Sequence, residues 1–166
     1  MKATRAKPVD HPTELQLFLR IKHPSLDPAE ITQALEIEPE RAIAAGADVS
    51  STGVRRLHTE SYWIAQLPTA SMLELAKRAR EGLASQEAGL GLSREDLLAL
   101  RGATVQDVPI LFRLRRLERH KEFFERINRE GGSVTLIVDR DETVRPLALK
   151  VALKKLAELG IALEVD

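Results

Sequence analysis

The fold of the first half of this chain is decided by six consecutive residues, Leu26-Asp27-Pro28-Ala29-Glu30-Ile31. Asp27 suits the N-cap of a helix, and Pro28 suits its first helical position. Glu30 occupies the N3 position of a capping box, while Leu26 and Ile31 can pack against each other across the cap. The stretch therefore predicts a helix over residues 28–36.

A strand is predicted directly before this helix, in the run Leu15-Gln16-Leu17-Phe18-Leu19-Arg20-Ile21-Lys22. Its residues at 15, 17, 19 and 21 are apolar, which is the period of a half-buried strand. Residues 1–14 are basic and punctuated by prolines, so we expect a mobile N-terminal arm there. A length of 166 residues is suited to one well-buried core. We therefore expect a single domain over residues 15–166.

A hairpin is predicted after the first helix. Pro39 cannot continue that helix and is well placed to start a second short turn that ends near Gly46. Residues 46–53 are rich in Asp, Ser, Thr and Gly, which is typical of a loop. Residues 54–57 and 62–67 then form two short apolar runs around His58-Thr59-Glu60-Ser61. These runs indicate two paired strands.

The rest of the chain alternates between helical and strand patterns. Apolar residues at three- and four-residue spacing, with capping signals, predict helices over 72–83, 93–101, 108–129 and 146–159, with a glycine-punctuated excursion over 84–92. Residues 134–138 and 161–165 have the pattern of strands. The order of elements predicts an α+β fold, with a mixed or mainly antiparallel sheet of about five strands and helices packed on one face.

Composition excludes several classes of function. The chain contains 25 Lys and Arg, 25 Asp and Glu, and no Cys. A net charge of zero disfavours a nucleic-acid binder that depends on phosphate contacts. The lack of Cys excludes disulfides, thiolate nucleophiles and zinc sites with sulfur ligands. No apolar run reaches the length of a membrane span, and no signal peptide is recognisable. We therefore expect a cytoplasmic protein, no membrane contact, no cofactor and no metal.

Several short motifs resemble a known family. They comprise Leu19-Arg20-Ile21, the Ser25–Ile31 stretch with its Leu-Asp-Pro, Leu35-Glu36-Ile37-Glu38-Pro39, Gly46, Glu60-Ser61-Tyr62-Trp63, and the closing residues 156–163. In this order they are similar to the bacterial domain of unknown function family 4279, from about Leu15 to the end of the chain. Glu36 departs from the pattern, because such sequences more often have Gly there. The resemblance implies a small α+β domain and no particular reaction.

The densest group of polar and aromatic side chains is His58, Glu60, Tyr62 and Trp63. A strand would place Glu60 and Tyr62 on one face and Trp63 on the other. An aromatic wall beside a carboxylate and an imidazole could line a ligand pocket. The simpler interpretation, which we favour, is a core tryptophan next to a polar turn.

A second candidate site lies in the predicted long helix. His120 falls on the same side as Phe124 and Ile127, and Arg113 lies one heptad earlier. Arg116 belongs to the same basic run over residues 113–121, which could meet an acidic partner or phosphates. Because Glu118, Glu122 and Glu125 interleave with this run, a solvated and self-paired face is the competing interpretation.

No common catalytic motif is present, which lowers the expectation of an enzyme without deciding the question. Our first hypothesis is a non-enzymatic protein–protein interaction domain, of the kind that includes immunity proteins and antitoxins, using Trp63, Arg113, Arg116 and His120. The second is a small-molecule binding domain or a hydrolase with His58 and Glu60 as acid–base groups. The expected partner is another protein, a homodimer is compatible with a small domain, and nucleic acid ranks third.

Overall fold

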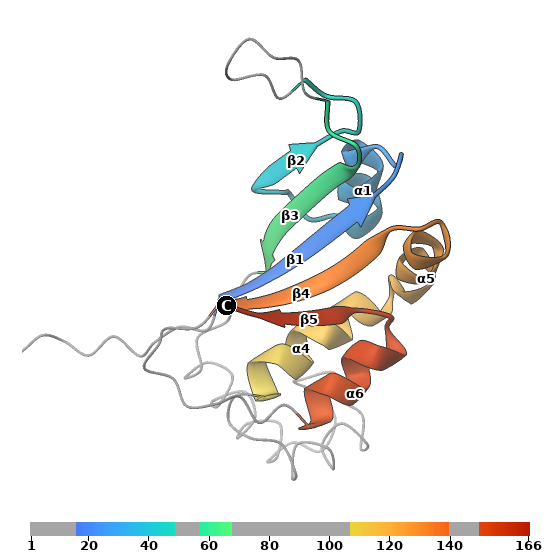
Figure 1. The fold of residues 1–166 in the computed structure, drawn as a ribbon. Helices are drawn as coiled ribbons and strands as arrows, with labels where there is room; N and C mark the ends of the chain where they lie inside the picture. Colours follow the sequence, from blue (N-terminus) through green and yellow to red (C-terminus); the bar gives the residue numbers. More distant parts are fainter. Residues whose placement is uncertain (1–15, 49–56, 68–106, 140–149) are drawn as a thin grey trace, which may run out of the picture.

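A five-stranded sheet organises the protein. The computed structural model describes residues 16–48, 57–67, 107–139 and 150–166, and the sheet has the strand order β2-β3-β1-β4-β5 (Figure 1). The strands are β1 (Gln16–His23), β2 (Arg41–Ile43), β3 (Ser61–Leu67), β4 (Ser133–Asp139) and β5 (Ala162–Val165). Neighbouring strands are antiparallel except β4 and β5, which are parallel. The sheet is therefore mixed and mainly antiparallel.

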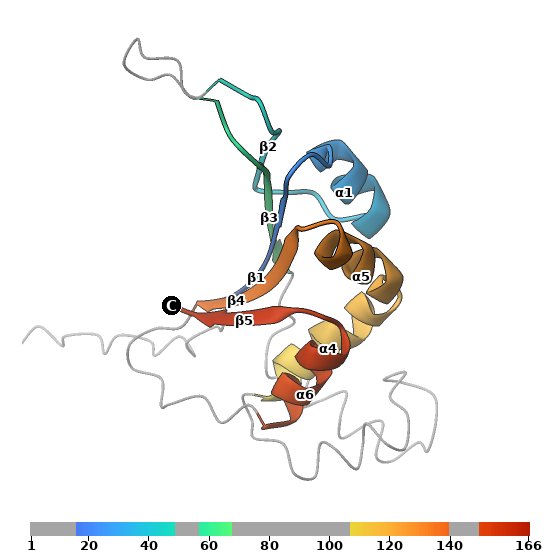
Figure 2. The same cartoon turned by 45° about the vertical axis from the view of Figure 1, so that its right-hand side comes forward.

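The helices of the described residues lie on one face of this sheet (Figure 2). They are α1 (Pro28–Leu35), α4 (Asp107–Glu118), α5 (Lys121–Arg129) and α6 (Lys150–Glu158). Together with the mixed sheet, this arrangement confirms the predicted α+β fold.

The central strand β1 shows why the helices gather on one side. Leu17, Leu19 and Ile21 are fully buried, and Phe18 and Arg20, which alternate with them, are half-buried on the other face. Burying the alternate apolar side chains requires a cover on that face alone. The core that results also contains Trp63 of β3, Leu114 and Phe124 of the helices, and Leu136 of β4, each inaccessible to solvent.

The predicted start of α1 is confirmed. Asp27 is the N-cap, and its Oδ1 accepts a hydrogen bond from the backbone N–H of Ala29 at 2.8 Å. Pro28 follows at the first helical position. The helix ends at Leu35, because Glu36 adopts the left-handed conformation with φ 55° and ψ 37°. Its N–H still donates to the carbonyl of Thr32 at 2.9 Å.

The prediction of one long helix over residues 108–129 was wrong. The structure has two helices, α4 and α5, with Arg119 and His120 between them. His120 has φ −104° and ψ 12°, which lies outside the helical range. The buried residues Leu117 and Phe124 are seven positions apart, and residues 118–122 between them are all polar. An apolar stripe that skips one turn does not hold a straight helix against the sheet.

The second short turn predicted to start at Pro39 and end near Gly46 is confined to Ala45 and Gly46. Residues 41–43 form β2, which pairs with β3 from Arg41↔Ile64 to Ile43↔Tyr62. The pairing continues beyond β2, because Gly46 N–H donates to His58 at 2.8 Å and His58 N–H donates to Ala47 at 3.0 Å. The partner of β3 in the hairpin is thus β2 and its extension, so residues 58–61 belong to one arm and not to its turn.

Other predictions lie outside the described residues. They concern the N-terminal arm over 1–14, the loop and strand residues 49–56, the helices 72–83 and 93–101, the excursion 84–92, and the first residues of the helix predicted over 146–159.

Candidate functional site

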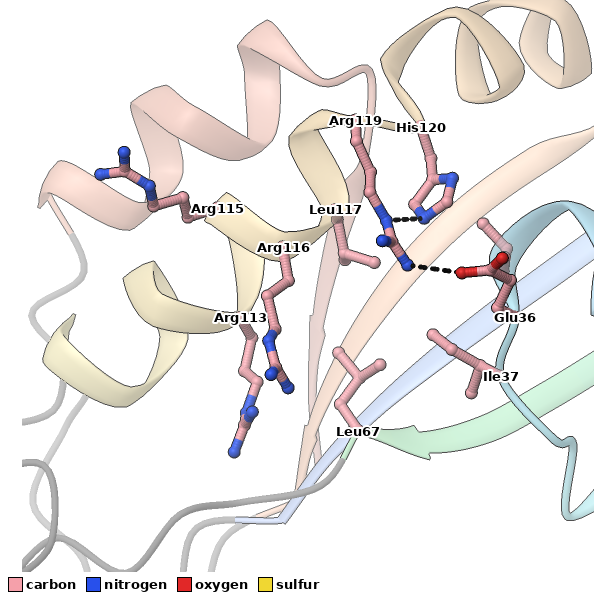
Figure 3. A pocket seen from close by; sticks show the side chains of 10 residues that line it. Glu36, Ile37, Leu67, Arg113, Arg115, Arg116, Leu117, Arg119 and His120 are labelled. Atoms are coloured by element: carbon pink, nitrogen blue, oxygen red, sulfur yellow. Dashed lines mark hydrogen bonds and ion pairs between the residues drawn. The ribbon is translucent and has the colours of Figure 1, made fainter. Parts of the chain in front are cut away.

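A cavity of about 430 Å³ lies between the end of α1 and the helix α4 (Figure 3). We call it the arginine groove. The lining residues come from α1 and the turn after it, from the end of β3, from α4, and from the break between α4 and α5. They are Leu35, Glu36, Ile37, Leu67, Arg113, Arg115, Arg116, Leu117, Arg119 and His120.

The helix α4 supplies most of the charge of the groove. Its buried residues Ile110, Leu114 and Leu117 anchor the helix in the core. Arg113 and Arg116 are three positions apart, so they lie one above the other on the helix surface. Figure 3 shows both side chains extending from α4 in the same direction, beside Leu67.

The floor of the groove is aliphatic. Leu35 closes α1, Ile37 follows it, Leu67 ends β3, and Leu117 belongs to the last turn of α4. Leu35, Leu67 and Leu117 are buried and Ile37 is packed against the core. Chain positions 35, 67 and 117 meet here only through the tertiary fold.

The two guanidinium groups of Arg113 and Arg116 are not neutralised within the part of the chain that the structure describes. None of the ion pairs found among those residues includes either arginine. Burial and the neighbouring charge of Arg116 lower the pKa of Arg113 from its ordinary value. Two adjacent like charges, one of them half-buried, disfavour each other, and an anion between them would relieve that cost.

Arg119 at the other end of the groove already holds a carboxylate. One guanidinium nitrogen lies 3.2 Å from Oε2 of Glu36, and Nε donates to Nε2 of His120 at 2.8 Å (Figure 3). Burial and the charge of Arg119 lower the pKa of His120, while Glu36 acts in the opposite direction. An Nε2 that accepts a hydrogen bond cannot carry a proton, so this contact favours the neutral imidazole.

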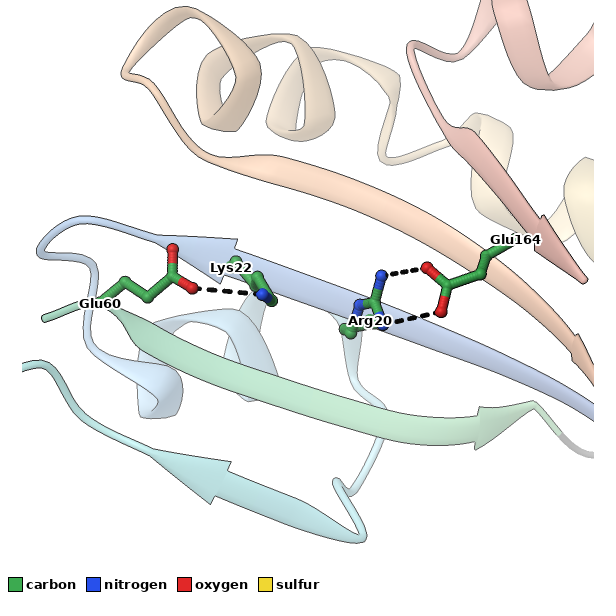
Figure 4. Close-up of polar contacts among 4 residues, drawn as sticks. All are labelled: Arg20, Lys22, Glu60 and Glu164. Carbon is green, nitrogen blue, oxygen red and sulfur yellow. Dashed lines mark hydrogen bonds and ion pairs between the residues drawn. The ribbon is translucent and has the colours of Figure 1, made fainter. Parts of the chain in front are cut away.

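Among the described residues, the side chains of the group at 58–63 do not converge on one face of the sheet. Trp63 is fully buried on the helical face of the sheet, where its Nε1 donates to Oγ1 of Thr32 in α1 at 3.0 Å. Tyr62 alternates with Trp63 and is half-buried on the other face. Glu60 forms an ion pair with Lys22 at 3.3 Å (Figure 4). His58 is half-buried, and its Nε2 has no hydrogen-bond partner within the described residues.

A second polar cluster, which the sequence pattern does not indicate, lies on the sheet face opposite the helices. Arg20 of β1 binds Glu164 of β5 through two hydrogen bonds of 3.1 and 2.5 Å (Figure 4). The hydrogen bond from Arg20 lowers the pKa of the Glu164 carboxyl. Because β4 lies between these strands, the pair ties the edge strand β5 to the centre of the sheet.

His23 at the end of β1 has a structural role. It is 4% exposed, and its Nδ1 accepts hydrogen bonds from the backbone N–H groups of Ser25 at 3.2 Å and Leu26 at 2.8 Å. These bonds shape the turn that leads into α1. Its Nε2 lies 3.3 Å from a carboxylate oxygen of Glu130.

The groove brings together three of the residues that the sequence singled out, Arg113, Arg116 and His120. Sequence reasoning missed Glu36 as a partner of Arg119, because the two residues are 83 positions apart. Arg119 could have been included, since it belongs to the same basic run. Arg115 also lines the cavity, although its side chain points away from Arg113 and Arg116 in Figure 3.

No helix in the described ranges is both long and apolar enough to cross a membrane. Among the described residues, no group of three or more His, Cys, Asp or Glu side chains is arranged to hold a metal ion.

Comparison with known proteins supports the resemblance over the first half of the chain. Residues 13–81 match the family model described as a domain of unknown function, DUF4279. The match includes β1, α1, β2 and β3 and ends before α4, so it does not extend to the closing residues 156–163. No curated protein matches the chain. No solved structure matches it either.

Proposed function

Because the matched family carries no assigned function, we propose one from the geometry of the groove: the protein is a non-enzymatic interaction domain that binds another protein through the arginine groove. The observation that carries this proposal is the pair of guanidinium groups, Arg113 and Arg116, held without a counter-ion from the described residues above an aliphatic floor. Buried apolar area framed by arginine is a common composition of protein interfaces.

The acid–base groups of the groove support binding over catalysis. His120 and Glu36 are both bonded to Arg119. A general base must reach the proton that it removes, and both of these groups face a guanidinium instead. The groove therefore offers a surface of fixed charge and shape, which is what recognition of a polypeptide requires.

The test is an affinity capture from the native host lysate with the full chain as bait, with and without nuclease, read by mass spectrometry. Three baits are compared: the wild type, the double variant Arg113→Gln/Arg116→Gln, and Arg129→Gln as the matched control. Arg129 is an exposed arginine near the end of α5 and does not line the groove. Each bait is first checked for a wild-type circular dichroism spectrum and melting temperature.

We expect a near-stoichiometric protein with the wild type and with Arg129→Gln, in the presence of nuclease, and its loss with the double variant. In titrations with that purified protein, the double variant should bind at least about tenfold more weakly, since charged hydrogen bonds contribute about 1.5–3 kcal/mol each. Equal recovery with a folded double variant would place the interaction elsewhere on the molecule.

A further inference from the structure

We propose that the arginine groove recognises an acidic polypeptide segment in which an aliphatic side chain lies beside two carboxylates. This inference rests on the proposed function and adds to it the chemistry of the partner. It is carried by three features of the groove: two guanidinium groups side by side, a third that already holds a carboxylate, and an aliphatic floor between them.

The spacing of Arg113 and Arg116 matches a partner that supplies two negative charges, one to each arginine. Residues three apart on a helix have Cβ atoms about 5–6 Å from each other. Each guanidinium is a planar fork of donors that matches one carboxylate. Two Asp or Glu side chains of a single bound segment, one turn apart if the segment is helical, can therefore each meet one arginine.

Arg119 shows which anion the groove accommodates. Its guanidinium lies 3.2 Å from a carboxylate oxygen of Glu36, and both side chains are mostly exposed, with 64% and 73% of their surface accessible. The chain thus provides its own example of a carboxylate bound at the rim. Arg113 and Arg116 lack such a partner among the described residues, and a carboxylate from another polypeptide would complete the set.

The aliphatic floor requires an apolar group of the partner in addition to its carboxylates. Leu35, Ile37, Leu67 and Leu117 line the groove beneath the guanidinium groups, and Ile37 is the half-buried member of this set, since the three leucines are at most 3% exposed. A volume of about 430 Å³ lies within the usual range for ligand sites, about 300–1,000 Å³. An aliphatic side chain of the partner can fill this space, and its burial would exclude water from the neighbouring ion pairs and strengthen them.

Nucleic acid fits the same groove less well. Single strands are usually held by stacking on aromatic side chains, and among the described residues the only ring that lines the groove is the imidazole of His120. Counterion release also favours proteins with net positive charge, and this chain has none.

The test is a selection from a phage-displayed library of random dodecamer peptides on the full, immobilised protein at low ionic strength. The enriched pool is sequenced and then rebound to the wild type, to Arg113→Gln/Arg116→Gln and to Arg129→Gln. A fourth bait, Ile37→Ala, reduces the aliphatic floor at its half-buried edge and is used only after its circular dichroism shows a folded protein. If that variant does not fold, the milder Ile37→Val replaces it.

We expect enriched peptides with two or more Asp or Glu residues within four positions of a Leu, Ile, Val or Met. Binding of individual peptides should fall about tenfold or more in the double arginine variant, fall severalfold in the floor variant, and remain unchanged in Arg129→Gln. Replacing the acidic residues of a peptide by Gln or Asn should have the same effect as removing the arginines.

Other outcomes overturn the inference. A pool without acidic enrichment, a pool that binds the double variant equally well, or no pool above background would each do so. If the lysate partner nevertheless depends on Arg113 and Arg116, the proposed function stands and only the partner chemistry falls. Displacement of the peptides by a single-stranded oligonucleotide at equal charge concentration would assign the groove to nucleic acid. Self-association of the chain that is lost in the double variant would assign it to a second copy.

Discussion

Glu36 adopts a backbone conformation that is unfavourable for a residue other than glycine. It closes α1 with φ 55°, and it is the only residue other than glycine with positive φ among those described. An L-residue in this conformation brings its Cβ too close to the following carbonyl, at a cost of about 1–2 kcal/mol. The resemblance to the family predicts Gly at this position, and glycine adopts positive φ without that steric cost.

We therefore predict that Glu36→Gly raises the free energy of unfolding by about 1 kcal/mol, because glycine adopts positive φ without that steric cost. The lost ion pair with Arg119 should subtract little, since both side chains are mostly exposed. The measurement is urea denaturation followed by tryptophan fluorescence. Glu36→Gln removes the same charge and keeps the strained conformation, so equal stability of the Gly and Gln variants would contradict the explanation.

The protonation of His120 should make stability depend on pH. Burial and Arg119 lower its pKa in the folded protein below the ordinary value of 6.5. The unfolded chain therefore takes up this proton at a higher pH than the folded chain does. The contribution of His120 to stability should be complete above about pH 6.5 and should be lost as the pH falls through the lower pKa of the folded state.

The measurement is an NMR titration of the His120 imidazole, assigned by its absence in His120→Gln. We expect a midpoint below 6.5 in the wild type, a still lower midpoint in Glu36→Gln, and a higher one in Arg119→Gln. The pH dependence of unfolding should also become less steep in His120→Gln. A wild-type midpoint at or above 6.5 would show that the contact with Arg119 does not control this proton.

The turn between α5 and β4 illustrates how closely elements pack at the end of the sheet. Gly132 donates its N–H to the carbonyl of Ile127 at 2.9 Å. A Cβ on Gly132 would lie 2.6 Å from the carbonyl oxygen of Lys22 in β1, and 2.8 Å from side-chain atoms of both His23 and Ile127. The first of these is backbone in the central strand and cannot move without disturbing the sheet.

Gly132→Ala should consequently destabilise the protein by about 1–3 kcal/mol, the usual cost of overpacking. The comparison is with Ser133→Ala, an exposed neighbour, for which we expect a change within about 0.5 kcal/mol. Thermal unfolding of both variants by circular dichroism would separate them. If the two substitutions had equal effects, the contact between this turn and β1 would not be as close as the structure indicates.

The elements also show what local pattern can and cannot predict. The alternation of β1 and the cap of α1 are set by neighbouring residues, and both were predictable. The break at His120 was visible as a missing apolar turn between Leu117 and Phe124, although the overall periodicity suggested one helix. The strand β2 has only three residues, and pairing with β3 decides its conformation. Pro39 and Gly46 have the local propensity for a turn across these residues. Pairing with β3 overrides that propensity and makes residues 41–43 a strand.

The residues that line the groove could likewise be predicted only in part. Arg113, Arg116 and His120 were predictable together because they share one stretch of helix-forming sequence. Their aliphatic floor was not, because Leu35 and Leu67 reach it from α1 and β3. Charge on a helix face can be predicted from periodicity, whereas the surface that faces it depends on tertiary packing.

The sheet is built from two parts of the chain. The segment that matches the family contains β1, α1, β2 and β3, whereas β4, β5 and the other helices follow it. The two parts meet where β1 pairs with β4, from Gln16↔Asp139 to Lys22↔Ser133. The arginine groove lies across the same junction, with Glu36 on one side and Arg119 on the other.

We predict that residues 13–81 alone do not fold cooperatively. Without β4, the central strand β1 becomes an unpaired edge, and its side chains Leu17, Leu19 and Ile21 lose the core residues of α4 and α5.

Trp63, the single tryptophan, reports on this part of the molecule, and far-UV circular dichroism is dominated by the helices. In the full chain both signals should change in one coincident urea transition, because the two parts share one core. In the segment, the emission should be that of exposed tryptophan, without a sigmoidal transition. Blue-shifted emission with cooperative unfolding of the segment would instead show that the matched region is a domain by itself, to which the arginine-bearing helices are an addition.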